Sequence, residues 1–176
     1  ASQNTFSHDP LTWLPDDSPA LHALQNYEQR MGSSMAIEVM LDTGVERGVN
    51  QPDFMQTLDL VQQELITWET DTYNVVKTLS VTNLLKESNR ALHDNDDAYF
   101  SIPDSAELIS QELFLVELDE PDDLYNLIDR RYQVARLTIL IPWLDALHAK
   151  ALKDRLTPYL QEKLGSHTTD ITITGT

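Results

Sequence analysis

The sequence predicts an α+β fold in which two strand–helix–strand units share one sheet. Four segments carry the two-residue alternation or the β-rich composition of strands. Two segments between them place apolar residues at every third or fourth position, as amphipathic helices do. Along the chain the order is strand, helix, strand, and the second half repeats the plan of the first.

The first unit begins with a predicted strand at residues 35–43, where apolar and more polar residues alternate. Pro52 then opens a helix predicted over residues 52–69. Residues 73–81 are rich in β-formers, and the crossover predicts that they lie parallel to the first strand in one sheet. The apolar stripe of the helix consists of Phe54, Leu58, Val61, Leu65 and Trp68.

The second unit begins at residues 132–141, which form the strongest predicted strand of the chain. A helix is predicted over residues 144–164, and Pro158 inside it should kink or split it because proline lacks a backbone donor. Gly165 ends this helix, and residues 169–174 alternate again as a final strand.

Between the two units, residues 82–131 form an insertion that is too long for a connecting loop. Helices are predicted at residues 83–93 and 105–118, the second capped by Ser105. The insertion is therefore interpreted as a small helical lobe. The two units in tandem predict a ferredoxin-like βαββαβ sandwich, with this lobe between its halves.

The sequence indicates one domain over residues 18–176, preceded by a lead-in at residues 1–17. Ser18 and Pro19 predict the start of a further helix that runs to residue 31, where Gly32 stops it. No apolar run approaches the roughly 20 residues that cross a bilayer.

The charge of the chain is strongly acidic, with 29 acidic and 12 basic residues and a formal net charge of −17. Such a surface repels phosphate backbones and anionic headgroups, so nucleic acid is not an expected partner. The chain contains no cysteine, which excludes disulfides, thiolate metal sites and cysteine nucleophiles.

Metal-binding motifs are absent from the sequence. The acidic segment next to His93 fails as a calcium loop, because Tyr99 and Ser105 occupy the positions of the required glycine and glutamate. No HExxH motif or closely spaced pair occurs among the histidines, which are His8, His22, His93, His148 and His167.

Catalytic motifs are absent as well. Residues 44–49 superficially resemble the phosphate-binding loop of acylphosphatases, but Glu46 would repel an anion and Pro52 removes an amide donor. No GxSxG elbow, Walker loop or dinucleotide fingerprint is present. We therefore expect no enzyme activity, no cofactor and no tightly held transition metal.

Several stretches of the sequence resemble the extracytoplasmic loops of RND-superfamily exporters of the MMPL type. They are WLPDDSP at residues 13–19, IEVMLDTG at 37–44, GVNQPDF at 48–54 and ARLT at 135–138. A longer stretch, SVTNLLKESNRALHDNDDAYFSIPDSAELISQELFLVEL at residues 80–118, carries the resemblance further, and residues 84–118 within it are the most diagnostic. The resemblance covers the chain from residue 11 to about residue 174.

The resemblance implies a porter-type domain on the periplasmic side of the bacterial inner membrane. Such a domain helps to form the path of hydrophobic or lipid-like cargo through a proton-driven exporter. Its implied partners are the transmembrane helices and the other periplasmic loop of the parent chain, and a homo-oligomer is compatible with it. The proton-carrying residues of the family lie in membrane helices, so the resemblance assigns no catalytic residue here. The lobe and the ending ITITGT favour the second periplasmic loop.

A free-standing ferredoxin-like module that binds a small ligand or regulates another protein is the alternative. Such domains hold ligands between their helices and their sheet. Apolar helices of about 20 residues directly flanking this segment in its parent gene would favour the exporter, and their absence would favour the module.

The candidate surface for cargo or a partner comes from four consecutive apolar residues in the predicted helix 105–118. A helix turns only about 100° of its circumference toward one core, so four neighbours cannot all point inward. At least one should face a groove for cargo or a neighbouring porter domain, unless the helix is buried all round. These residues are Leu113, Phe114, Leu115 and Val116.

Overall fold

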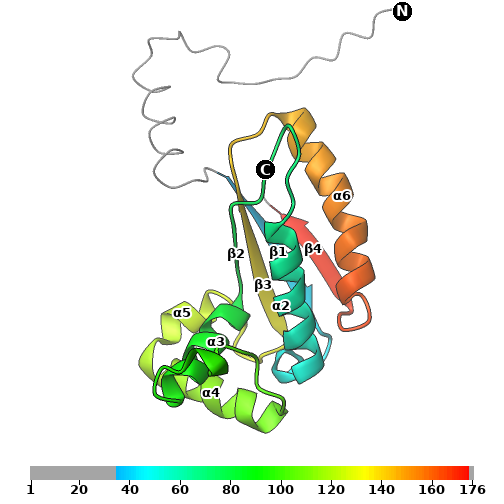
Figure 1. Cartoon of the computed structure of the whole chain (residues 1–176). Coiled ribbons are helices and arrows are strands. Elements are labelled where there is room, and N and C mark those ends of the chain that lie inside the picture. Colours follow the sequence, from blue (N-terminus) through cyan, green and yellow to red (C-terminus); the bar gives the residue numbers. More distant parts are fainter. Residues whose placement is uncertain (1–34, 175–176) are drawn as a thin grey trace, which may run out of the picture.

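The computed structural model describes residues 35–174, and both the predicted lead-in and the helix predicted at residues 18–31 lie outside this range. Four strands form one antiparallel sheet in the order β2-β3-β1-β4 (Figure 1). The prediction that all four strands share a sheet is confirmed. Because β1 and β2 are each antiparallel to β3, they run parallel to each other, as the crossover predicts. The strands are β1 (Met35–Asp42), β2 (Lys77–Leu79), β3 (Val134–Ile141) and β4 (Asp170–Thr174).

Two helices, α2 (Pro52–Ile66) and α6 (Ala146–Leu164), cover one face of the sheet (Figure 1). The sheet turns every second side chain of its central strands toward them, and Ile37 of β1 lies opposite Ile139 of β3. Full burial of one such side chain contributes about 1.5–3 kcal/mol. The alternation in the sequence therefore places the core between sheet and helices, as predicted.

The second strand is shorter than its prediction. Residues 73–81 were expected to be β-structure, but only Lys77–Leu79 form β2. Ser80 instead caps a helix: its Oγ accepts a hydrogen bond from the Thr82 amide, and Asn83 Oδ1 accepts one from the Ser80 amide over 2.9 Å. This capping box ends the strand because it turns the chain into a helix at the next residue.

The last helix is continuous across Pro158, so the predicted split is wrong. Proline leaves the carbonyl of Asp154 without its helical donor. Both residues lie on the exposed side of α6, where water can satisfy that carbonyl. The buried stripe, which includes Leu156 and Leu160, lies on the other side and is not interrupted.

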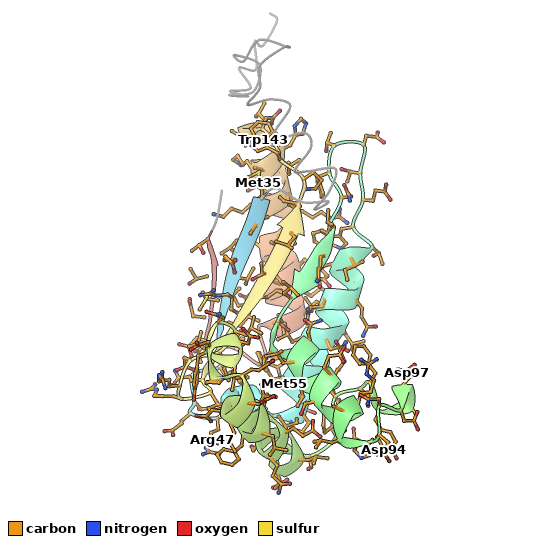
Figure 2. The ribbon with its side chains drawn as sticks, turned by 90° about the vertical axis from the view of Figure 1, so that its left-hand side faces the viewer. Met35, Arg47, Met55, Asp94, Asp97 and Trp143 are labelled. Atoms are coloured by element: carbon orange, nitrogen blue, oxygen red, sulfur yellow. The ribbon has the colours of Figure 1, made fainter. Side chains whose placement is uncertain are left out.

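The insertion between β2 and β3 is helical, and it gathers at one end of the sheet (Figure 1). Ser105 caps α4 as predicted, since its Oγ accepts from the Leu108 amide over 3.1 Å. Arg47, Asp94 and Asp97 lie at this end of the molecule, whereas Met35 and Trp143 lie at the other (Figure 2). The helices of the lobe are α3 (Val81–Leu92), α4 (Ala106–Asp119) and α5 (Pro121–Tyr125).

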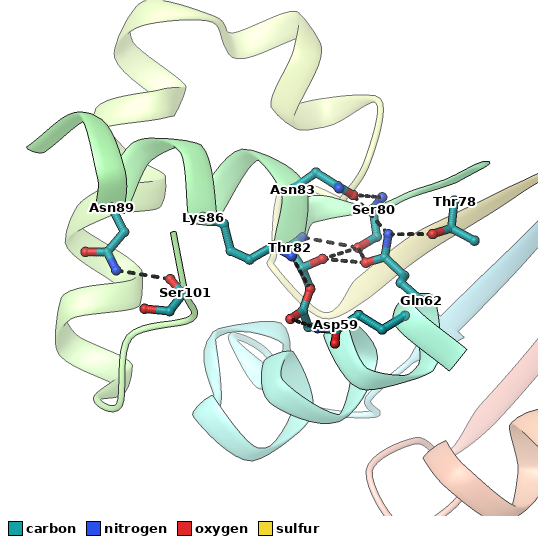
Figure 3. Close-up of polar contacts among 10 residues, drawn as sticks. Asp59, Gln62, Thr78, Ser80, Thr82, Asn83, Lys86, Asn89 and Ser101 are labelled. Carbon is teal, nitrogen blue, oxygen red and sulfur yellow. Dashed lines mark hydrogen bonds and ion pairs between the residues drawn. The ribbon is translucent and has the colours of Figure 1, made fainter. Parts of the chain in front are cut away.

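A buried polar cluster joins the lobe to α2 (Figure 3). Gln62 Oε1 accepts hydrogen bonds from the hydroxyls of Ser80 and Thr82, and its amide nitrogen donates to Asn83 Oδ1 over 2.9 Å. The start of α3 is therefore fixed to α2 by side chains of which Gln62, Ser80 and Thr82 are buried.

Candidate functional site

The four candidate residues on α4 divide between the interior and the surface. Leu113 is fully buried and Val116 is partly buried, whereas Phe114 is 54% exposed and Leu115 is 45% exposed. This division follows the 3.6-residue period of the helix, which turns consecutive residues to different sides. The reading in which α4 is buried all round is therefore wrong.

A groove runs between α3 and α4, with a volume of about 290 Å³. Of the four candidates, Leu115 and Val116 line it, while Leu113 and Phe114 do not. The structure thus brings together half of the predicted set. The remaining apolar lining comes from Leu84, Ala91 and Leu92 of α3.

Sequence reasoning missed the α3 side of this groove. The helix predicted at residues 83–93 was given no part in a surface site, yet Leu92 is 52% exposed and lines the groove. The spacing in the sequence could have indicated this surface. Leu85 and Asn89 lie four residues apart on one side of α3, and both are buried. Two adjacent rows on one helix allow one to pack inward and the other to face the groove.

The rim of the groove is acidic. Glu87, Asp119 and Glu120 are the charged residues among those that line it, and no lysine or arginine of residues 35–174 does so. Of these three, Glu87 is paired with Arg90 of α3. Lys86 bonds Asp59 of α2 at 2.5 Å, and Arg90 bonds both Glu87 and Asp97.

Glu112 of α4 is a buried carboxyl with only 1% of its surface exposed. Neither of its oxygens has a hydrogen-bond partner in the described part of the chain. Burial raises the pKa of Glu112 to about 7, and the nearby His93 opposes this shift. Glu112 is therefore protonated in the folded lobe at mildly acidic pH.

The far end of α4 is tied to the chain that leads into β3. The hydroxyls of Tyr125 and Tyr132 both donate to the carboxylate of Glu117. These two bonds lower the pKa of Glu117, because they stabilise its charged form. The bonds also hold α4 against the start of β3.

The acidic segment after α3 uses its polar groups within the protein. Asp96 Oδ1 accepts a hydrogen bond from the Ala98 amide over 2.9 Å, and Asp97 bonds Arg90. The His93 ring stacks on Tyr99 with 3.7 Å between the ring centroids. Within residues 35–174 no group of three or more potential ligands could hold a metal ion.

The loop that superficially resembles a phosphate cradle uses the amides of Gly44, Arg47 and Gly48 in hydrogen bonds within the protein. The Gly44 amide donates to Asp42 Oδ1 over 2.7 Å, so a carboxylate already holds the place of an anion. The Arg47 amide donates to the Arg131 carbonyl, and the Gly48 amide donates to the Val45 carbonyl. Gly44 has φ +78°, which suits a residue without a side chain.

None of the helices within residues 35–174 combines the length and the apolar character needed to cross a membrane. A scan against protein-family models matched no family, and searches of curated proteins and of solved structures found no match.

Proposed function

We propose that this chain is a periplasmic porter-type domain of a proton-driven RND-superfamily exporter of the MMPL type. It has no catalytic role of its own and contributes a wall to the path of hydrophobic or lipid-like cargo. The observation that carries the proposal is the coincidence of two features in residues 80–118. This segment holds the most diagnostic resemblance in the sequence, and it forms α3 and α4, which both leave apolar side chains exposed.

The sheet topology supports a ferredoxin-like sandwich as the fold of this domain. The strand order β2-β3-β1-β4 with every pair antiparallel is the order that a βαββαβ sandwich requires. The helices α2 and α6 occupy the same face of the sheet, as the two crossovers of such a sandwich do. The lobe is then an insertion after the second strand.

Apolar exposure on α4 supports a role in contact with cargo or with the parent chain. Phe114, Leu115 and Leu118 are each between 45% and 67% exposed. Clustered exposed apolar side chains mark interaction sites more often than scattered ones do. In the exporter the partners would be its transmembrane helices and its other periplasmic loop.

The coding sequence on both sides of this segment tests the proposal directly. We expect apolar stretches of about 20 residues to flank it in the parent gene. Their absence would reject the exporter and favour a free-standing ligand-binding or regulatory module.

Export by the full-length parent provides the functional measurement. Phe114→Ser should reduce export while leaving the fold intact, because its side chain is more than half exposed. Leu147→Ser on α6 is the control, since Leu147 is 43% exposed outside the lobe. Equal export by the wild type and Phe114→Ser would show that the exposed side of α4 is not part of the cargo path.

A further inference from the structure

The groove between α3 and α4 combines an apolar floor with an acidic rim. Its floor includes Leu92 and Leu115, which are each about half exposed, and its rim includes Asp119 and Glu120. We infer that this groove docks an amphipathic helix of a protein partner, with apolar residues on one face and lysine or arginine beside them. This inference concerns the isolated surface and does not depend on the exporter proposal.

The shape of the groove suits a helix. The groove is lined by residues 84–92 of α3 and by residues 115–120 at the end of α4, which corresponds to about 12 Å and about 8 Å at 1.5 Å per residue. The end of α3 lies beside the start of α4, since Asn89 and His93 share a pocket with Ser105 and Leu108. A third helix laid between two such neighbours packs its side-chain ridges into their groove. A partner helix of about three turns would cover the floor.

Apolar contact would hold the partner. Leu92 of α3 and Leu115 of α4 both line the groove, and Leu84 and Val116 in its lining are partly buried. Side chains at positions i, i+3, i+4 and i+7 of a docked helix can reach such a floor. Leu118, three residues after Leu115, is 67% exposed and extends the apolar strip along α4.

Charge selects a basic helix over other apolar occupants. Asp119 is the last residue of α4 and lies at the negative end of its helix dipole, whereas Glu120 caps the end of α4 and the start of the short helix α5. No basic side chain of the described residues forms a salt bridge with either one. The whole chain has a formal net charge of −17, and the electrostatic field of this charge attracts a basic partner at long range and repels anionic lipid headgroups.

Binding of a designed peptide to the 176-residue chain tests the inference. The probe is a leucine–lysine peptide of about 14 residues with leucine at helical spacing. A peptide of the same composition in scrambled order and a leucine–glutamate peptide serve as comparisons. We expect saturable binding of the first peptide only, with NMR shift changes concentrated in α3 and α4.

Paired variants separate the groove from general attraction between opposite charges. Leu115→Gln should weaken binding about tenfold, whereas Leu147→Gln on α6 should leave it unchanged. Asp119→Lys should weaken it at low salt more than Asp71→Lys, which makes the same charge change in the α2–β2 loop, away from the lobe (Figure 1). Circular dichroism of each variant verifies the fold.

Several results would overturn the inference. Equal binding of the ordered and scrambled peptides would show that only the net charge of the peptide causes the binding. Unchanged affinity in Leu115→Gln would place any binding elsewhere. A dimer of the chain alone that Leu115→Gln dissolves would assign the groove to a second copy. Leu115-dependent binding of neutral phosphatidylcholine vesicles would assign it to lipid. None of these outcomes bears on the flanking gene sequence, so the exporter proposal is tested separately.

Discussion

Tyr132 donates its hydroxyl hydrogen to Glu117 Oε2 over 2.8 Å, which ties the chain before β3 to the last turns of α4. Tyr132 has φ +54°, a left-handed conformation that costs a residue with a side chain about 1 kcal/mol. Its backbone is held on both sides: its amide donates to the Asp129 carbonyl, and its carbonyl accepts from the Val49 amide. The strained turn and the side-chain bond together fix the lobe to the sheet.

Tyr132→Phe should therefore loosen this attachment. Removal of one charge-assisted hydrogen bond should lower the free energy of unfolding by about 1–2 kcal/mol, measured by urea denaturation. Tyr99→Phe is the control, since the Tyr99 ring is 42% exposed and its stacking on His93 does not need the hydroxyl. A loss as large in Tyr99→Phe as in Tyr132→Phe would contradict the assigned role.

Glu112 should make the stability of the chain depend on pH. Its pKa is raised from 4.5 to about 7 by burial, so between these values the folded chain retains a proton that the unfolded chain has released. The free energy of unfolding therefore falls as pH rises through this window, by on the order of 3 kcal/mol, and this contribution is constant on either side of it.

Glu112→Gln should remove this slope, because the amide does not titrate. The measurement is urea denaturation at several pH values between 4 and 8. The slope of the free energy of unfolding against pH is compared, because the buried amide also changes the free energy itself by an amount that does not depend on pH. Glu107→Gln, on the exposed side of the same helix, should keep the wild-type slope. A slope that persists in Glu112→Gln would show that other groups cause it.

The regular parts of the fold were predictable because their patterns have one interpretation. In β3 every second residue is apolar and buried, and no competing helical period exists there. In β2 the composition favoured a longer strand, but its predicted first residues bond back to the segment after α2, where Asn74 bridges Glu69 and the Val75 amide donates to the Trp68 carbonyl. At the other end, the cap formed by Ser80 and Asn83 stops the strand. Local hydrogen bonds of this kind outweigh strand propensity, which depends on packing.

The candidate surface was predictable only in part. Four apolar neighbours on one helix had to divide between two sides, and Phe114 and Leu115 are indeed exposed. The partner side of the groove depends on how α3 packs, which the sequence does not specify. Glu112 also escaped notice, although its spacing from Ile109 and Val116 places it on the inward face of α4.

Pro158→Ala should stabilise the chain. The carbonyl of Asp154 would regain a helical donor, and proline in a helix interior is about 3 kcal/mol less favourable than alanine. Because proline also restricts the unfolded chain, we expect a net gain of about 1–2 kcal/mol in the free energy of unfolding. Thr157→Ala, its exposed neighbour, should change stability by less than about 0.5 kcal/mol. A loss of stability in Pro158→Ala would show that the residue is accommodated without cost.

Gln62→Ala should be the most destabilising of these substitutions. Gln62 is 4% exposed, and its removal leaves the buried hydroxyls of Ser80 and Thr82 without their acceptor. An unsatisfied buried polar group costs about 1–3 kcal/mol, so a loss of about 3 kcal/mol or more is expected. Hydrogen exchange should rise first at the start of α3, because this cluster fixes that end of the helix to α2. Gln63→Ala is the matched control on the exposed side of α2, where the side chain bonds only Asp59 among the described residues. If both variants lost the same stability, or if exchange rose equally along α6, the cluster would not be the attachment of the lobe.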